Sequence, residues 1–207
     1  KPYNSEPLYA LALAIHGRCH IESLKRKHRD CDFCDLTCCQ AYRGRSGLPP
    51  VEGAFIDTTG ISCGLFFHSS SGGRLFSESV FNSGGRKSKP PVDILYSENL
   101  TLSRNLHQSW EALIDKKDAA DILCPGHEMN IQGIRYDPLK EIVILDTDNG
   151  EKPLAPEDFR LKINRKRGWN FIKSNNYTLT EEKGNYIFKG SGLGHCAGMS
   201  IDGALEL

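Results

Sequence analysis

Residues 168–190, GWNFIKSNNYTLTEEKGNYIFKG, contain two runs rich in aromatic and β-branched residues that are separated by Lys183-Gly184. Such runs on either side of a glycine turn predict an antiparallel hairpin. Working outward from this hairpin, residues 131–138 (IQGIRYDP) and 141–150 (EIVILDTDNG) also predict strands, and the second of them ends in an Asn149-Gly150 turn. The carboxyl-terminal half of the chain is therefore expected to contain mainly antiparallel strands.

Two segments carry apolar residues at helical spacing. Residues 7–27 predict a helix, because Leu8, Leu11 and Ile15 recur every three or four positions. Residues 106–123 predict a second helix that ends before Pro125-Gly126. The expected fold class is α+β, with a long N-terminal helix, mixed and mainly antiparallel strands, a second mid-chain helix and a cleft between lobes. Residues 1–207 are predicted to form one domain, which can be divided into two lobes, residues 1–90 with 185–207 and residues 91–184.

The composition is that of an ordinary globular protein, with 207 residues, of which 39% are hydrophobic and 25% are charged. Lys and Arg number 26, as do Asp and Glu, so the formal net charge is zero. A neutral chain argues against broad, charge-driven binding to nucleic acid, and no nucleic-acid partner is expected, although a local basic patch is compatible with this balance. The longest apolar run, residues 7–15, is far shorter than the roughly 20 residues that span a bilayer.

One short region concentrates residues that bind metals. Four of the eight cysteines and one histidine fall within twelve residues: His28, Cys31, Cys34, Cys38 and Cys39. Zinc takes four thiolate or imidazole ligands in a tetrahedron, and the close spacing favours a structural zinc site. The spacing alone also allows two disulfides in an oxidising compartment, or buried free thiols.

Two glycine- and serine-rich segments are further candidates for a site. In FHSSSGGR (residues 67–74) a serine follows a histidine, but the GxSxG motif of serine hydrolases is absent, and a polar turn after a buried strand is the alternative. In GSGLGHCAGMSIDGA (residues 190–204) His195 can contact a ligand or hold a tight loop. Glu6 stands just before the first predicted helix, where a carboxylate also suits the helix dipole.

Taken in order, several segments resemble the stage II sporulation protein D family of bacterial cell-wall enzymes. SEPLYALALAIHG is similar to the alanine-rich helix of that family, and DLTCCQAYRG to its DxTHCQxYxG stretch. GLFFHSSSGGR resembles AxYHSSSGGxT, and GSGLGHCAGMSIDGA resembles GRGWGHGVGMSQYGA. PLAPEDFRLKI and KSNNYTL are similar to two further family motifs. The similar segments are collinear from residue 5 to residue 204.

The resemblance implies a lytic transglycosylase that cleaves the bond between N-acetylmuramic acid and N-acetylglucosamine in peptidoglycan. In this family a glutamate acts first as general acid and then as base, and the 6-hydroxyl of the sugar closes an anhydro ring. The resemblance aligns Lys1-Pro2 with the residues that follow this glutamate, so the acid is expected just before Lys1, and Glu6 is the weaker candidate. The substrate-binding residues that we infer are His68, Ser69, Ser70, Arg74 and His195.

The resemblance also bears on the metal, on the location and on alternative functions. Some family members hold zinc in the region of the cysteine cluster, which favours His28, Cys34, Cys38 and Cys39 as ligands, with Cys31 as the substitute. A glycan substrate implies an extracytoplasmic, periplasmic or cell-envelope location, with a signal peptide or anchor expected before Lys1, and partners among other cell-wall hydrolases or divisome proteins. Leu193 and Cys196 replace the tryptophan and a glycine of the family motif, which indicates a divergent member. The alternatives are a catalytically impaired glycan-binding module or activator of a cell-wall hydrolase that keeps the fold without the acid, and a structural zinc domain that mediates protein contacts.

Overall fold

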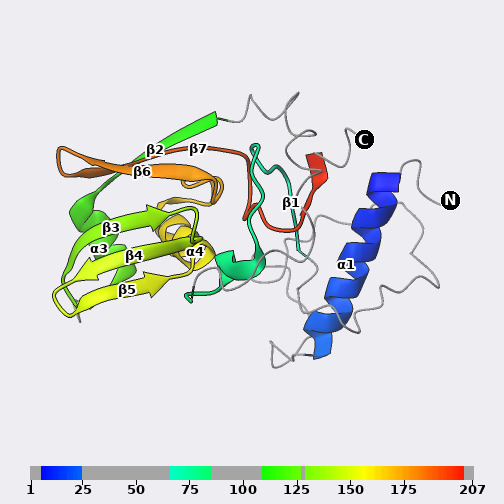
Figure 1. The fold of residues 1–207 in the computed structure, drawn as a ribbon, viewed down its shortest axis with the longest axis horizontal. Coiled ribbons are helices and arrows are strands. Elements are labelled where there is room, and N and C mark those ends of the chain that lie inside the picture. The colour runs from blue at the N-terminus through cyan, green and yellow to red at the C-terminus, as the bar shows by residue number, and fades with distance from the viewer. Residues whose placement is uncertain (1–5, 25–65, 85–108, 127–128, 203–207) are drawn as a thin grey trace. The chain divides into compact units, whose positions relative to one another are not determined.

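The computed structural model describes residues 6–24, 66–84, 109–126 and 129–202. The chain divides into two compact units, Lys1–Phe67 and His68–Leu207, and each is described by itself. In the first unit the described helix is α1 (Glu6–Leu24), with Glu6 in its first turn (Figure 1). Ile15, one of the apolar residues on its expected inner face, is 37% exposed.

The first sheet of the larger unit has the strand order β2-β7-β6 and is antiparallel throughout. Its strands are β2 (Ser109–Asp115), β6 (Tyr177–Glu182) and β7 (Asn185–Ser191). The turn between β6 and β7 is Lys183-Gly184, where both residues have positive φ angles of 49° and 79°. Two consecutive positive φ values match the twist of a two-residue hairpin, so the predicted hairpin is confirmed.

The second sheet has the order β3-β4-β5 and is also antiparallel. It consists of β3 (Ile131–Asp137), β4 (Ile142–Thr147) and β5 (Gly150–Leu154). The predicted strands in residues 131–138 and 141–150 are confirmed. Gly150, with a φ angle of +98°, lies at the turn between β4 and β5.

Two helices accompany these sheets, α3 (Lys116–Leu123) and α4 (Pro156–Arg167). The helix α4 begins with Pro156 at its first position and carries Glu157 and Asp158 in its first turn, which are favourable start signals. Helices and sheets share one apolar core, in which the largest fully buried side chains include Ile114, Phe159, Ile163, Tyr186 and Phe188.

The remaining elements are short. They are β1 (Phe67–His68), the 3-10 helix η1 (Glu78–Phe81) and β8 (Met199–Ser200), and β1 pairs with β8 as a third sheet. Within the described residues, no helix is long and apolar enough to cross a membrane.

The predicted fold class is wrong. In the described part of the chain, eight strands in three sheets outnumber three α-helices, in place of the predicted α+β fold with a second mid-chain helix. The predicted N-terminal helix is present as α1 (Glu6–Leu24). The second predicted helix, 106–123, is correct only in its second half: β2 occupies Ser109–Asp115, and α3 covers Lys116–Leu123. The physical reason is the period of burial, because Trp110, Ala112 and Ile114 point inward at every second position, while Leu113 is 53% exposed.

Candidate functional site

The two glycine- and serine-rich segments of the larger unit lie against each other. Ser70 and Leu193 exchange both backbone hydrogen bonds, at 3.1 Å and 2.9 Å. A parallel bridge joins Phe76 to Ala197, where the Phe76 amide donates to the carbonyl of Cys196 at 2.8 Å. The structure therefore brings together the two glycine- and serine-rich segments that the sequence marked as candidates for a site, and their contact is a backbone contact.

This contact requires glycine on both sides. A Cβ atom on Gly72 would lie 2.4 Å from the carbonyl carbon of Ser191, and one on Gly192 would lie 2.7 Å from the amide nitrogen of Gly72. Both glycines also have positive φ angles, +62° and +86°, which side chains rarely adopt. The glycines of the two motifs thus serve the approach of two backbones to each other.

The buried side chain of His68 also links the two segments. It is 4% exposed, and its Nδ1 lies 3.0 Å from the carbonyl oxygen of Ala197, to which it can donate a hydrogen bond. Its Nε2 is buried and has no hydrogen-bond partner. Burial lowers the pKa of His68 to about 4, despite the hydrogen bond to Ala197, which raises it, and the nearby His195 lowers it further. At neutral pH His68 is an uncharged, structural imidazole.

The neighbours of His68 in the second segment are also well packed. The half-buried ring of His195 lies 5.7 Å from the ring of His68 and 5.1 Å from that of Phe81, measured between centroids. Its Nδ1 accepts a hydrogen bond from the Ala197 amide at 3.2 Å. Cys196 is fully buried at a φ angle of +59°, and burial raises the pKa of its thiol to about 11. A thiol in this state is not a nucleophile at neutral pH.

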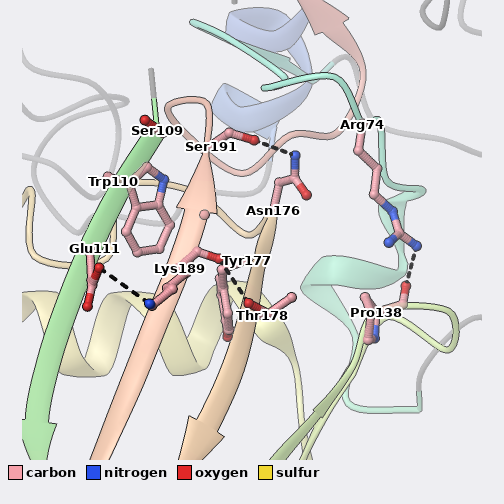
Figure 2. Close-up of a pocket in the computed structure, with 11 residues that line it drawn as sticks. Arg74, Ser109, Trp110, Glu111, Pro138, Asn176, Tyr177, Thr178, Lys189 and Ser191 are labelled. Atoms are coloured by element: carbon pink, nitrogen blue, oxygen red, sulfur yellow. Dashed lines mark hydrogen bonds and ion pairs between the residues drawn. The ribbon is translucent and has the colours of Figure 1, made fainter. Parts of the chain in front are cut away.

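An open pocket of about 680 Å³ lies beside this contact, on the sheet of β2, β7 and β6 (Figure 2). It is lined by Arg74, Ser109, Trp110, Glu111, Pro138, Asn176, Tyr177, Thr178, Lys189, Gly190 and Ser191. Gly190 is required here as well, because a Cβ atom at this position would lie 2.5 Å from the Trp110 ring. The pocket therefore uses the start of the second glycine-rich segment as part of its floor.

Hydrogen bonds fix the polar residues of the pocket. The Asn176 amide group donates to the carbonyl of Gly72 at 3.0 Å and to the hydroxyl of Ser191 at 3.1 Å, which ties the pocket to the contact of the two segments. The indole nitrogen of Trp110 donates to the Ser174 hydroxyl at 3.2 Å. Two charged residues of the pocket form an ion pair, with Lys189 Nζ 3.8 Å from Glu111 Oε2, so their charges offset each other.

The predicted substrate-binding residues take different places. Arg74 lines the pocket, where its guanidinium donates to the carbonyl of Pro138 at 2.8 Å and lies 4.8 Å from the centre of the Phe76 ring. His68, Ser69, Ser70 and His195 do not line it: His68 and Ser70 are buried in the segment contact, and Ser69 is exposed. Glu6 is an exposed residue of the first unit, at the start of α1.

In the described part of the larger unit two carboxylates are buried, and both have structural partners. Glu157 forms a two-fold ion pair with Arg160, at 2.9 Å and 2.7 Å, and accepts a hydrogen bond from the Asn175 amide group at 2.9 Å. Glu141 accepts from the backbone amide of Ser77 at 3.0 Å and from the hydroxyls of Ser77 and Ser79. Although burial alone lowers the pKa of Arg160, the hydrogen bond and charge of Glu157 outweigh it, and the pKa is raised. Neither carboxylate faces the pocket.

The predicted zinc ligands, His28, Cys31, Cys34, Cys38 and Cys39, lie outside the described residues. In the described ranges no group of three or more metal-binding side chains comes together.

Of the eleven residues that line the pocket, the sequence identified only Arg74 as a site residue; Trp110, Asn176 and Ser191 are among those it missed. The signal for Trp110 was the alternation of β2, while Asn176 lies within the KSNNYTL segment and Ser191 near the start of GSGLGHCAGMSIDGA.

No protein-family model matches the chain, and a search of curated proteins found no match.

Proposed function

We propose that this protein binds and remodels the glycan strands of peptidoglycan at the cell envelope. The observation that supports this best is the joining of the HSSSGGR and GSGLGHCAGMS segments, which carry the resemblance to the cell-wall enzymes. These segments are roughly 120 residues apart in the sequence, yet they meet through glycines that tolerate no side chain. The pocket opens where they meet.

The chemistry of the pocket suits an uncharged sugar chain. Ser109, Asn176, Thr178 and Ser191 offer hydroxyl and amide groups, which match the hydroxyls and acetamides of a glycan. Arg74 adds a cation at one side, while the charges of Glu111 and Lys189 offset each other. An open pocket on a sheet can accept one part of a long strand while the rest of the strand runs past it.

The proposed reaction is lytic transglycosylation, which needs one carboxylic acid to protonate the glycosidic oxygen. Among the residues that line the pocket the carboxylate is Glu111, and it is exposed and paired with Lys189. By the resemblance, the acid is instead expected just before Lys1, and Glu6 is the weaker candidate.

The pairing of Glu111 also favours a second candidate function, a glycan-binding module that activates another cell-wall hydrolase. In this case the protein binds the strand and its partner cleaves it.

Binding and cleavage can be tested in one experiment on purified peptidoglycan sacculi. Co-sedimentation measures binding, and the release of anhydro-muramic acid products measures cleavage. Thr178 and Thr180 are both exposed residues of β6, but of the two only Thr178 lines the pocket. We expect Thr178→Tyr to weaken binding about fivefold or more by filling the pocket, while Thr180→Tyr binds like the parent.

Each outcome has a separate meaning. Binding with anhydro products supports the enzyme, and binding without them supports the module. If the parent protein does not bind sacculi, or if both tyrosine variants bind like the parent, the pocket is not a glycan site.

A further inference from the structure

A second surface of the larger unit is strongly basic and carries an exposed aromatic ring. It lies at the end of α4 and in the turn that follows, and we call it the basic turn; its members are Lys162, Arg165, Lys166, Arg167, Trp169 and Lys173. All six residues are exposed, and they lie in the part of the chain where residues 159–180 contain no Asp or Glu. None of them lines the pocket.

The helix dipole explains part of this arrangement. Arg165, Lys166 and Arg167 form the last turn of α4, where cations interact favourably with the negative end of the helix. The dipole does not explain Trp169, which is 46% exposed although tryptophan is a large apolar side chain. It does not explain Lys162 and Lys173 either, which lie outside the last turn and are also exposed.

Hydrogen bonds fix the main chain of the turn that carries Trp169. Gly168 ends the helix at a φ angle of +110°, and the Phe171 amide donates to the Gly168 carbonyl at 3.0 Å. The buried Asn164 side chain donates to the Trp169 carbonyl at 3.0 Å. The main chain of the turn is therefore fixed from the core side, while the Trp169 side chain stays exposed.

The charge of this surface is largely unbalanced. Arg167 has an acidic neighbour, Asp118, at 3.4 Å, and its guanidinium also lies 5.7 Å from the centre of the Phe171 ring. The whole chain has zero formal net charge, so five cations within residues 162–173 reflect a segregation of charge rather than an overall excess. A surface of this kind is complementary to an extended negative surface.

We propose that the basic turn docks on a membrane surface that contains anionic phospholipids. Cations near such a surface are attracted to the headgroups, and tryptophan favours the boundary between headgroups and acyl chains. The basic turn offers both cations and an exposed indole. A single-stranded nucleic acid is disfavoured, because such sites use a basic groove with successive stacking aromatics, whereas this surface is a turn with one exposed indole. This docking is independent of the proposed glycan site.

Intrinsic fluorescence and vesicle co-sedimentation test the proposal on the full chain. The protein contains two tryptophans, and Trp110 is 6% exposed, so a blue shift of emission on adding vesicles would report Trp169. We expect the shift with vesicles of phosphatidylcholine and about one third phosphatidylglycerol, and not with phosphatidylcholine alone. Binding should weaken as the ionic strength is raised above about 0.1 M, where the Debye length is about 10 Å and charges are increasingly screened.

The charge requirement is tested with two triple variants of equal net charge. Arg165→Gln/Lys166→Gln/Arg167→Gln removes cations from the basic turn, and the control Lys140→Gln/Lys152→Gln/Lys183→Gln removes three exposed cations elsewhere in the larger unit. Since each cation near an anionic surface changes partitioning about fivefold, we expect the first variant to lose tenfold or more and the control to stay within about twofold.

The remaining variant and probe decide between lipid and other partners. Trp169→Phe should abolish the fluorescence shift and leave the circular dichroism spectrum unchanged. The proposal is overturned if both triple variants bind vesicles equally, if the parent does not bind anionic vesicles, or if it binds a single-stranded oligonucleotide at the same salt concentration more tightly than the vesicles.

Discussion

The Nδ1 atom of His68 lies 3.0 Å from the carbonyl oxygen of Ala197, a residue 129 positions later in the sequence. This contact links the first glycine- and serine-rich segment to the second, beside the backbone pairing of Ser70 with Leu193. Because the imidazole is buried, it is stable there in its neutral form.

The first prediction concerns pH. The pKa of His68 is lowered from 6.5 to about 4 on folding, so the unfolded state binds more protons between these values. The stabilisation by neutral His68 is therefore complete above pH 6.5 and is lost as the pH falls toward 4, by up to about 3 kcal/mol. Urea denaturation at a series of pH values between 7 and 4 measures this slope.

A variant isolates the contribution of this residue. His68→Asn retains a hydrogen-bond donor but cannot titrate, so the free energy of unfolding should fall less steeply with acidification than in the parent. Equal slopes in the two proteins would assign the acid sensitivity to other groups.

The second prediction concerns the approach of the two glycine-rich backbones. Gly72 and Gly73 both have positive φ angles, +62° and +91°, but a Cβ atom at Gly72 would collide with Ser191, whereas one at Gly73 meets nothing within 4 Å. Both alanine variants carry the strain of a left-handed backbone, about 1–2 kcal/mol. We expect Gly72→Ala to cost about 2 kcal/mol more than Gly73→Ala in thermal or chemical denaturation. Similar losses for the two would mean that the segments can separate without cost.

The third prediction concerns the turn after α4. Asn164 is buried, and its side chain makes three hydrogen bonds of 2.9–3.0 Å, to the carbonyls of Trp169 and Ile172 and from the amide of Ile172. Asn164→Ala leaves these buried backbone groups unpaired and should lower the free energy of unfolding by about 2–4 kcal/mol. The exposed Asn170 provides the control, since Asn170→Ala should change it by less than about 0.5 kcal/mol. A small effect at Asn164 would show that the turn is not held by this side chain.

The fourth prediction concerns the cysteine cluster. Its spacing and the family resemblance predict one bound zinc on His28, Cys34, Cys38 and Cys39. Native mass spectrometry should show the mass of one zinc ion, which is lost with a chelator and also as the pH falls, because binding requires thiolates. A metal-free protein with two intact disulfides in the cluster would contradict this prediction.

The strands could be predicted where the turn and the apolar pattern agree. The hairpin around Lys183-Gly184 and the strand before Asn149-Gly150 are examples, since each has a strong local turn signal. The residues of β2 were wrongly predicted to be helical, because the spacings Trp110-Leu113 and Trp110-Ile114 fit a helical period. The pairing of β2 with β7 instead imposes a period of two. Tertiary pairing of this kind is not visible in a single segment.

The candidate site could be predicted only in part. Glycine and serine marked both segments, but sequence alone could not tell that His68 and Ser70 point into their contact, while Arg74 reaches the pocket. The role of Asn176 could not be predicted either, because its amide group binds the carbonyl of Gly72, 104 residues earlier in the chain. A side chain whose hydrogen-bond partner is a backbone group far away in the sequence leaves no recognisable pattern in its own segment.

The position of β7 in the middle of its sheet has a consequence for synthesis on the ribosome. The strands β2 and β6 pair with β7 and not with each other, and Ser70 pairs with Leu193. Neither that sheet nor the segment around Ser70 can therefore reach its final hydrogen bonding until β7 and Leu193 have been translated. At about 5–20 residues per second this delay is on the order of ten seconds after Ser70 is added. During that interval β2, with its apolar inner face, has no partner strand in this sheet, so a nascent chain is a natural client for chaperones, and a stop codon before β7 would leave a product that cannot build this half of the unit.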